Sequence, residues 1–262
     1  MPELLIPKPK GPIHLLLPIN LIIWIDPLVD QGVERALYYS GTYEMGTLDI
    51  IQRYLPEDGV FVDVGANIGL MSLVAALRLG DKGQVIAFEP SEKTRQIAQH
   101  NIEINNLEDK ITLLSKGLGS KQDRKLLFDN LDINRGAASF VKGKESRGGE
   151  EIEITTLDTN YANHRIDVLK VDVEGYELEV LKGAVKILQR KRPPVLIVEC
   201  TEETEHQDFT RVDLFNFILT TQPKYKCYKL KGTKLRRSDL IEIKKVSDLP
   251  THDNLICIPK AI

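Results

Sequence analysis

From residue 59 onward, short apolar runs alternate with stretches of helical periodicity. The runs expected to form strands are 60–64, 84–88, 110–114, 166–171 and 194–198. The helical patterns between them are 68–79, 91–105 and 174–189. Strands that alternate with helices are typical of a parallel sheet with helices packed on both faces. This order predicts an α/β fold, a three-layer sandwich built on a mostly parallel sheet.

The two ends of the chain, and the region before residue 166, depart from this alternation. Additional strands are expected at 125–128, 138–141, 151–155, 225–229, 240–243 and 254–258, and an additional helix at 212–219. The polar, glycine-rich stretch 142–149 predicts a mobile loop. Residues 13–25 predict two strands joined at 18–20. Since no linker divides the chain, we predict one domain over 41–262, preceded by an N-terminal β extension over 1–40.

The composition excludes several classes of protein. With 262 residues, 42% of them apolar and 28% charged, the chain has the composition of an ordinary globular protein. Its net charge of −3 provides no global basic field that would attract nucleic acid. The apolar segment 13–25 is broken by Pro18 and Asn20, and each half is shorter than the ~20 residues that cross a bilayer. We therefore expect no transmembrane segment, with a peripheral membrane contact as the alternative.

Three cysteines, Cys200, Cys227 and Cys257, are widely spaced and form no CxxC pair. This spacing does not indicate a disulfide framework, and we expect all three as small buried side chains in a reducing compartment. The expected location is therefore cytoplasmic.

The stretch "VFVDVGANIGL" (60–70) is the most informative part of the chain. An apolar strand reaches Asp63, and Gly65, Asn67 and Gly69 follow at alternate positions before a helix begins. Glycine and asparagine adopt left-handed backbone conformations most readily. Such a turn lies outside the carboxyl end of a strand, where open α/β sheets bind nucleotides. A tight turn without a ligand is the alternative interpretation.

The turn does not match the glycine pattern of a pyrophosphate-binding site. Counted from Gly65, the pattern Gly-x-Gly-x-x-Gly requires glycine where this chain has Asn67 and Leu70. Asp63, just inside the strand end, would instead direct a carboxylate at an ammonium or hydroxyl group. That charge suits the amino-acid end of a ligand better than a pyrophosphate.

Glu89 and Pro90 end the next strand and provide a second anchor. Glu89 lies 20 residues after Gly69, the spacing expected for an acid that binds two ribose hydroxyls. Together the two motifs predict a pocket for an adenosine that carries an amino-acid tail, which is S-adenosyl-L-methionine.

Several further motifs, in this order and spacing, resemble the FkbM family of S-adenosylmethionine-dependent methyltransferases. They are "GTYEMGTLDII", "VFVDVGANIGL", "GQVIAFEPSE", "HNIEINNL", "TLD" and "DVLKVDVEGYELEVLKGA", over roughly residues 40 to 200. The resemblance implies the class I methyltransferase, Rossmann-like fold, a mostly parallel sheet whose last strand is antiparallel. It also implies methylation of a hydroxyl group on a sugar, glycan or secondary metabolite.

The resemblance also assigns residues to the donor. Those carried over to the methionine part are Asp63, Gly65, Asn67 and Gly69, and Glu89 is carried over to the ribose, with Pro90 beside it. Ser115 to Gly117 would lie beside the adenine. Glu44 matches an acid that precedes the glycine motif and is expected at the methionine end. Asp172 is expected to contribute to this pocket as well.

Candidate catalytic residues follow the fourth and fifth strands. Asp172 ends a strand beside the glycine motif, where its carboxylate could accept a proton from a hydroxyl, bind that hydroxyl or bind the donor. Glu174 is expected at a helix start, as a cap or as a second catalytic acid. His206, in the loop after Glu199, is the other candidate base. Glu177 is expected to turn into the fold and pair with backbone N–H groups.

A metal site formed by Asp172, Glu199 and His206 is an alternative, but their spacing is not diagnostic, and we assign no metal. The segment 224–245 carries nine lysine and arginine residues, which fit the solvated face of a strand better than an RNA-binding surface. We therefore expect no nucleic-acid partner.

The sequence predicts an S-adenosylmethionine-dependent O-methyltransferase with a small-molecule or glycan acceptor, and the composition is compatible with a homo-oligomer. The N-terminal strands and 142–149 are expected to cover the acceptor. The alternatives are an NAD(P)-dependent oxidoreductase and a non-catalytic, methyltransferase-like binding module.

Overall fold

Eight strands form the central sheet of the computed structural model, which describes residues 7–129, 135, 138–140, 147–201 and 209–260. In spatial order they are β5 (Ile111–Leu114), β4 (Gln84–Phe88), β3 (Val60–Val64), β9 (Val168–Val171), β10 (Val195–Thr201), β13 (His252–Pro259), β11 (Tyr225–Leu230) and β12 (Leu240–Glu242). The first five are parallel, and β13 runs antiparallel to both β10 and β11. The predicted fold class is therefore confirmed.

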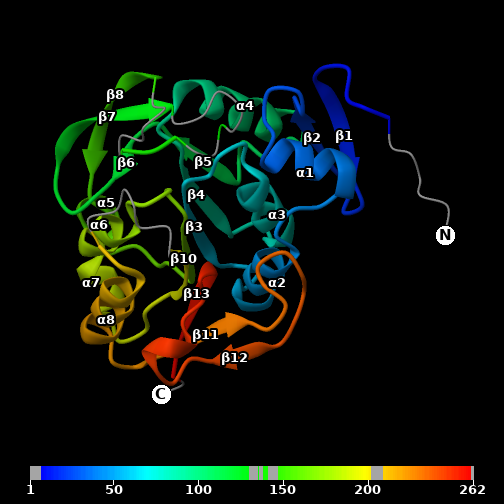
Figure 1. The fold of residues 1–262 in the computed structure, drawn as a ribbon. Helices are drawn as coiled ribbons and strands as arrows, with labels where there is room; N and C mark the ends of the chain where they lie inside the picture. Colours follow the sequence, from blue (N-terminus) through cyan, green and yellow to red (C-terminus); the bar gives the residue numbers. More distant parts are fainter. Residues whose placement is uncertain (1–6, 130–134, 136–137, 141–146, 202–208, 261–262) are drawn as a thin grey trace.

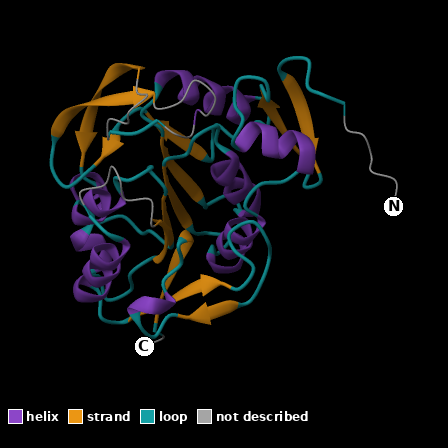
Figure 2. Cartoon of the chain, in the orientation of Figure 1, coloured by secondary structure: helices purple, strands orange, loops and turns teal. Residues whose placement is uncertain are grey.

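Helices cover both faces of this sheet (Figures 1 and 2). One layer contains α2 (Met45–Tyr54), α3 (Leu70–Arg78) and α4 (Glu92–Glu103), and the other contains α5 (Leu157–Tyr161), α6 (Glu177–Lys182), α7 (Val185–Leu188) and α8 (Arg211–Thr221). Because successive strand residues point to opposite faces, Phe61 packs in the core beneath the first layer and Val62 in the core beneath the second. No helix in the described part of the chain is long and apolar enough to span a membrane.

The expected N-terminal strands are β1 (Ile13–Leu17) and β2 (Leu21–Ile25), followed by α1 (Val33–Ser40), which the sequence did not predict. Side-chain amides of α4 and of the turn that follows it attach the free edge of β2. Asn101 accepts a hydrogen bond from Trp24 N–H at 2.6 Å and donates to Trp24 O at 3.3 Å. Asn105 makes the same pair of bonds with Ile22, at 3.0 and 2.6 Å. The motif "HNIEINNL" therefore holds the N-terminal hairpin onto the domain.

A second sheet contains β6 (Gly117–Leu118), β8 (Arg147–Thr155) and β7 (Asp123–Asp129). The strand predicted at 138–141 is wrong, because Ser139 makes only a single bridge with Phe128. The loop predicted at 142–149 is too long, since 147–149 belong to β8, and 142–146 lie outside the described residues.

The helix predicted at 174–189 is also wrong, because this segment contains two short helices, α6 and α7. Asp158 explains the break: its carboxylate accepts hydrogen bonds from Lys186 N–H and Ile187 N–H at 2.8 and 3.1 Å, which caps a new helix start. The main chain at Gly183, between the two helices, also packs closely against the segment that contains Gly119. A Cβ at position 183 would lie 2.0 Å from Gly119 O.

The amide bridge at Asn101 gives a stability prediction. Asn101 is fully buried and also donates to Ile68 O at 3.0 Å, so Asn101→Leu leaves two carbonyls and one N–H of the main chain without partners. We expect the free energy of unfolding to fall by about 3 kcal/mol, measured by urea titration. The control is Gln99→Leu on the exposed face of the same helix. Equal effects of the two substitutions would contradict the structural role of Asn101.

Candidate active site

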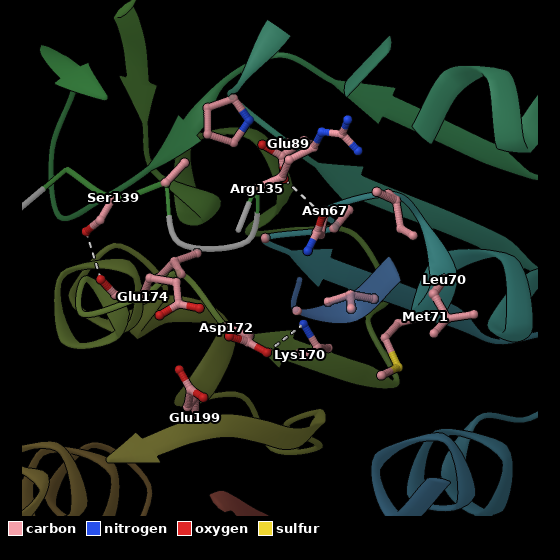
Figure 3. Close-up of a pocket in the computed structure, with 18 of the residues that line it drawn as sticks. Asn67, Leu70, Met71, Glu89, Arg135, Ser139, Lys170, Asp172, Glu174 and Glu199 are labelled. Carbon is pink, nitrogen blue, oxygen red and sulfur yellow. Dashed lines mark hydrogen bonds and ion pairs between the residues drawn. The ribbon is translucent and has the colours of Figure 1, made fainter. Parts of the chain in front are cut away.

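A cavity that opens to solvent lies at the carboxyl ends of the central parallel strands (Figure 3). The turn after β3 contributes Gly65 and Asn67, and the end of β4 contributes Glu89 and Pro90. The ends of β9 and β10 contribute Lys170, Asp172 and Glu199. The cavity therefore occupies the edge at which the sequence predicted a nucleotide-type site.

The turn after β3 uses the left-handed conformations that its residues permit. The φ angles of Gly65, Asn67 and Gly69 are 83°, 51° and 90°. At Gly65 the requirement is also steric, since a Cβ there would lie 1.8 Å from the carbonyl oxygen of Asp172. Asn67 Oδ1 is buried without a hydrogen-bond partner among the described residues. Gly69 does not line the cavity and serves as the N-cap of α3.

Glu89 joins the turns that follow β3 and β4. Its two carboxylate oxygens accept hydrogen bonds from Asn67 N–H at 2.9 Å and Ser91 N–H at 3.0 Å. Burial outweighs these bonds and raises the pKa of Glu89 to about 7. Each oxygen can accept a second hydrogen bond, so the carboxylate can still bind a ligand from the cavity.

Asp63 does not reach the cavity itself but pairs with Lys170, which lines it. It is fully buried, does not line the cavity and accepts a hydrogen bond from Ser72 Oγ at 2.7 Å. Lys170 Nζ lies 3.5 Å from Asp63 Oδ1 and 3.4 Å from Asp172 Oδ2. Burial acts to raise the pKa of Asp172, but Lys170 and then Lys234 outweigh it and hold that pKa below its ordinary value. Asp172 is therefore an ionised carboxylate at the end of β9.

Glu174 lies in a turn and not at a helix start, so its predicted helix-capping role is wrong. It has φ +52°, and α6 begins only at Glu177. Its carbonyl accepts a hydrogen bond from Ser139 Oγ at 2.8 Å. The prediction for Glu177 is confirmed, because its carboxylate accepts Val173 N–H and Gly175 N–H at 3.0 and 3.1 Å and fixes this turn.

Three carboxylates from the ends of β9 and β10 and the turn after β9 converge at the cavity (Figure 3). One oxygen from each of Asp172, Glu174 and Glu199 lies within 4.8 Å of the others, a spacing at which oxygen ligands could hold a divalent cation. Desolvation, followed by Glu199 and Asp172, raises the pKa of Glu174 to about 9. His206 lies outside the described residues, and its predicted role as a base stays a prediction.

The sequence did not predict that Lys234 belongs to the cavity. Its Nζ is 3.0 Å from Glu44 Oε1 and 2.8 Å from Glu199 Oε1. Glu44, which the sequence predicted as a site residue, lines the cavity. It is the residue that immediately precedes α2. Lys234 lies in a basic segment, where lysine side chains are usually solvated. The sequence around it therefore did not indicate that it would be buried in the cavity.

Arg135, from the described part of the segment between β7 and β8, meets the N-terminal region at the cavity. Arg135 lines the cavity, donates its main-chain N–H to Asp30 Oδ2 at 2.7 Å and pairs through its guanidinium with Glu34. Gly117, predicted beside the adenine, is buried behind Phe140, whose ring lines the cavity and would lie 2.7 Å from a Cβ at Gly117. Ser115 is exposed and does not line the cavity.

The parallel sheet with its antiparallel strand β13, and the cavity at the ends of β3, β4 and β9, define a methyltransferase of the α/β class. The chain belongs to the FkbM methyltransferase family, because the model of the methyltransferase FkbM domain matches residues 63–226. The predicted resemblance is thus confirmed.

Two relatives of known class support this assignment. The chain is 32% identical to methyltransferase sdnD of Sordaria araneosa, over 58% of this chain and 69% of that protein. It is 31% identical to the hexuronic acid methyltransferase AglP of Haloferax volcanii, over 64% of this chain and 67% of that protein. A crystal structure of methyltransferase FkbM from Methylobacillus flagellatus has 20% identity and a TM-score of 0.49, covering 85% of this chain and 52% of that one.

The contact at Gly65 can be tested against a matched glycine. Gly41 also has a left-handed φ, +67°, but a Cβ there meets nothing within 4 Å. Gly41→Ala should therefore cost only the backbone strain, about 1 kcal/mol of unfolding free energy. Gly65→Ala should cost at least about 3 kcal/mol, because the methyl group overlaps the main chain at the end of β9. Urea titration measures both, and similar losses would contradict the close approach.

Proposed function

We propose that this methyltransferase uses S-adenosyl-L-methionine and methylates a hydroxyl group on a sugar, glycan or secondary metabolite. The observation that carries the proposal is that Glu89, the Gly65 turn and the ionised carboxylate of Asp172 all line one cavity. The first two suit a ribose and an amino-acid tail, and the third suits a hydroxyl that must lose a proton.

The residues of the chain fit the donor. Gly65 and Asn67 would border the methionine part, where the unpartnered Asn67 Oδ1 is an acceptor for its ammonium group. Glu44 contributes a negative charge at the same end, and Glu89 would accept bonds from ribose hydroxyls. When bound, the sulfonium centre of the donor supplies an activated methyl group.

Asp172 would orient the acceptor hydroxyl and receive its proton. The ammonium of Lys170, 3.4 Å away, keeps Asp172 ionised and therefore able to accept a hydrogen bond at neutral pH. The hexuronic acid methyltransferase among the relatives supports a sugar acceptor. Approach and orientation remain the main contribution of the protein, since the donor is already activated.

One calorimetric experiment separates this function from its alternatives. We expect S-adenosylhomocysteine to bind, and NAD and NADP not to bind, because Asn67 and Leu70 stand where a pyrophosphate turn needs glycine. Binding of NAD or NADP alone would favour an oxidoreductase. The absence of S-adenosylhomocysteine binding would reject the proposal.

Asp172→Asn tests the role of the base. We expect turnover to fall at least ~100-fold, because Asn cannot take up the proton. The variant should still fold, as judged by circular dichroism, and should still bind S-adenosylhomocysteine. Release of S-adenosylhomocysteine is measured on a panel of glycans, nucleoside sugars and polyketides, with exposed Asp109→Asn as the charge-matched control. Near-normal turnover of Asp172→Asn would exclude this role.

A further inference from the structure

We propose that Lys234 is a positioning residue of the donor pocket, whose ammonium pairs with Glu44 and Glu199 and holds both carboxylates at the cavity. This inference rests on the proposed function, since it assigns Lys234 to binding of the methyl donor. Lys234 lies in the loop between β11 and β12, and Figure 1 shows this loop (orange) passing beside α2. Both Lys234 and Glu44 lie outside residues 63–226, the part of the chain that matches the family.

The first argument is the pairing itself. The ammonium of Lys234 is 2.8 Å from Glu199 and 3.0 Å from Glu44, and the three side chains are 11%, 7% and 2% exposed. Within the described residues, no other cation makes an ion pair with either carboxylate. A buried carboxylate that loses its cation leaves an uncompensated charge, which is strongly unfavourable.

The second argument is that the backbone aims this side chain. Lys234 O accepts a hydrogen bond from Gly46 N–H at 2.9 Å, which ties the loop to the first turn of α2. A Cβ at Gly46 would lie 2.9 Å from Lys234 O and 2.8 Å from Arg236 O, so only glycine lets the loop approach α2 this closely. The loop is therefore built against the segment that contains Glu44.

The third argument is that the other oxygen of Glu44 is also fixed. Thr47 Oγ1 donates to Glu44 Oε2 at 2.8 Å, and Asn254 Nδ2 donates to Thr47 Oγ1 at 2.8 Å. With one oxygen bound by Thr47 and the other by Lys234, the carboxylate of Glu44 is held in a single orientation at the methionine end. Removal of Lys234 leaves Glu44 Oε1 without its ion pair.

The charges around Lys234 determine what its removal does. The titratable and charged groups that face it or its partners are Tyr43, Glu44, Lys170, Asp172, Glu174, Glu199, His252 and Asp253. Carboxylates outnumber cations in this group, and Lys234 is the cation nearest to Glu44 and Glu199. Without it, Glu44 and Glu199 have no paired cation, and the repulsion among the carboxylates of the cavity is uncompensated.

The test is the binding of S-adenosylhomocysteine by Lys234→Met, measured calorimetrically. We expect at least tenfold weaker binding at pH 7, because Glu44 and Glu199 lose the cation that holds them at the cavity. The matched control is Lys231→Met, an exposed lysine in the same loop, which should bind as the wild type does.

The double variant Lys234→Met/Glu199→Gln separates charge pairing from a purely structural role. If Lys234 acts as a counter-charge, removing the charge of Glu199 as well should recover several-fold in affinity over Lys234→Met. A further loss of affinity, or equal binding by Lys234→Met and Lys231→Met, would overturn the inference. If neither Lys234 variant folds, as judged by circular dichroism, the role is structural only and the inference also fails.

The wild-type titration distinguishes failure of this inference from failure of the proposed function. If the wild type does not bind S-adenosylhomocysteine, the proposed function is rejected, and the role of Lys234 in donor binding is rejected with it. If the wild type binds and Lys234→Met behaves as the control does, only the role of Lys234 is rejected.

Discussion

The contact between the Gly65 turn and the end of β9 determines the shape of the site. Strands β3 and β9 are parallel neighbours, and Asp172 N–H donates to Val64 O at 3.0 Å just beyond their paired residues. The turn after β3 then passes over the carbonyl of Asp172 with no room for a side chain. Because this approach fixes the glycine turn against Asp172, one contact positions both the backbone proposed to bind the donor and the proposed base.

The carboxylates that surround this contact are held in place by ion pairs with two buried lysines. Lys170 lies between Asp63 and Asp172, and Lys234 lies between Glu44 and Glu199. Each lysine is buried, yet the adjacent carboxylates raise its pKa above the ordinary value. The two lysines therefore offset part of the cost of burying these carboxylates in a poorly hydrated crevice, where hydrogen bonds and charge interactions are stronger than in water.

The parallel strands, the glycine turn and the position of Glu89 could be predicted because each depends on residues that are adjacent in the sequence. Apolar runs and turn residues are local signals, and they placed β3, β4 and most helices of the first layer correctly. The break between α6 and α7 was not predictable in this way, because the cap comes from Asp158 in a different element. Lys234 likewise acquires its role from Glu44, 190 positions away, so its own neighbours in sequence indicate only a solvated residue.

The amide bridges between α4 and β2 bring two different periodicities into register. Ile22 and Trp24, two residues apart, are separated by roughly 7 Å along a strand. Asn101 lies in the last turn of α4, and Asn105 lies in the turn just beyond the helix end at Glu103. Four residues of helical chain advance by about 6 Å and rotate by roughly 40°, so the two repeats agree over this one turn and diverge beyond it. The end of α4 and the turn after it can thus act as a third strand for two residues only, which gives the hairpin a short attachment of unique register.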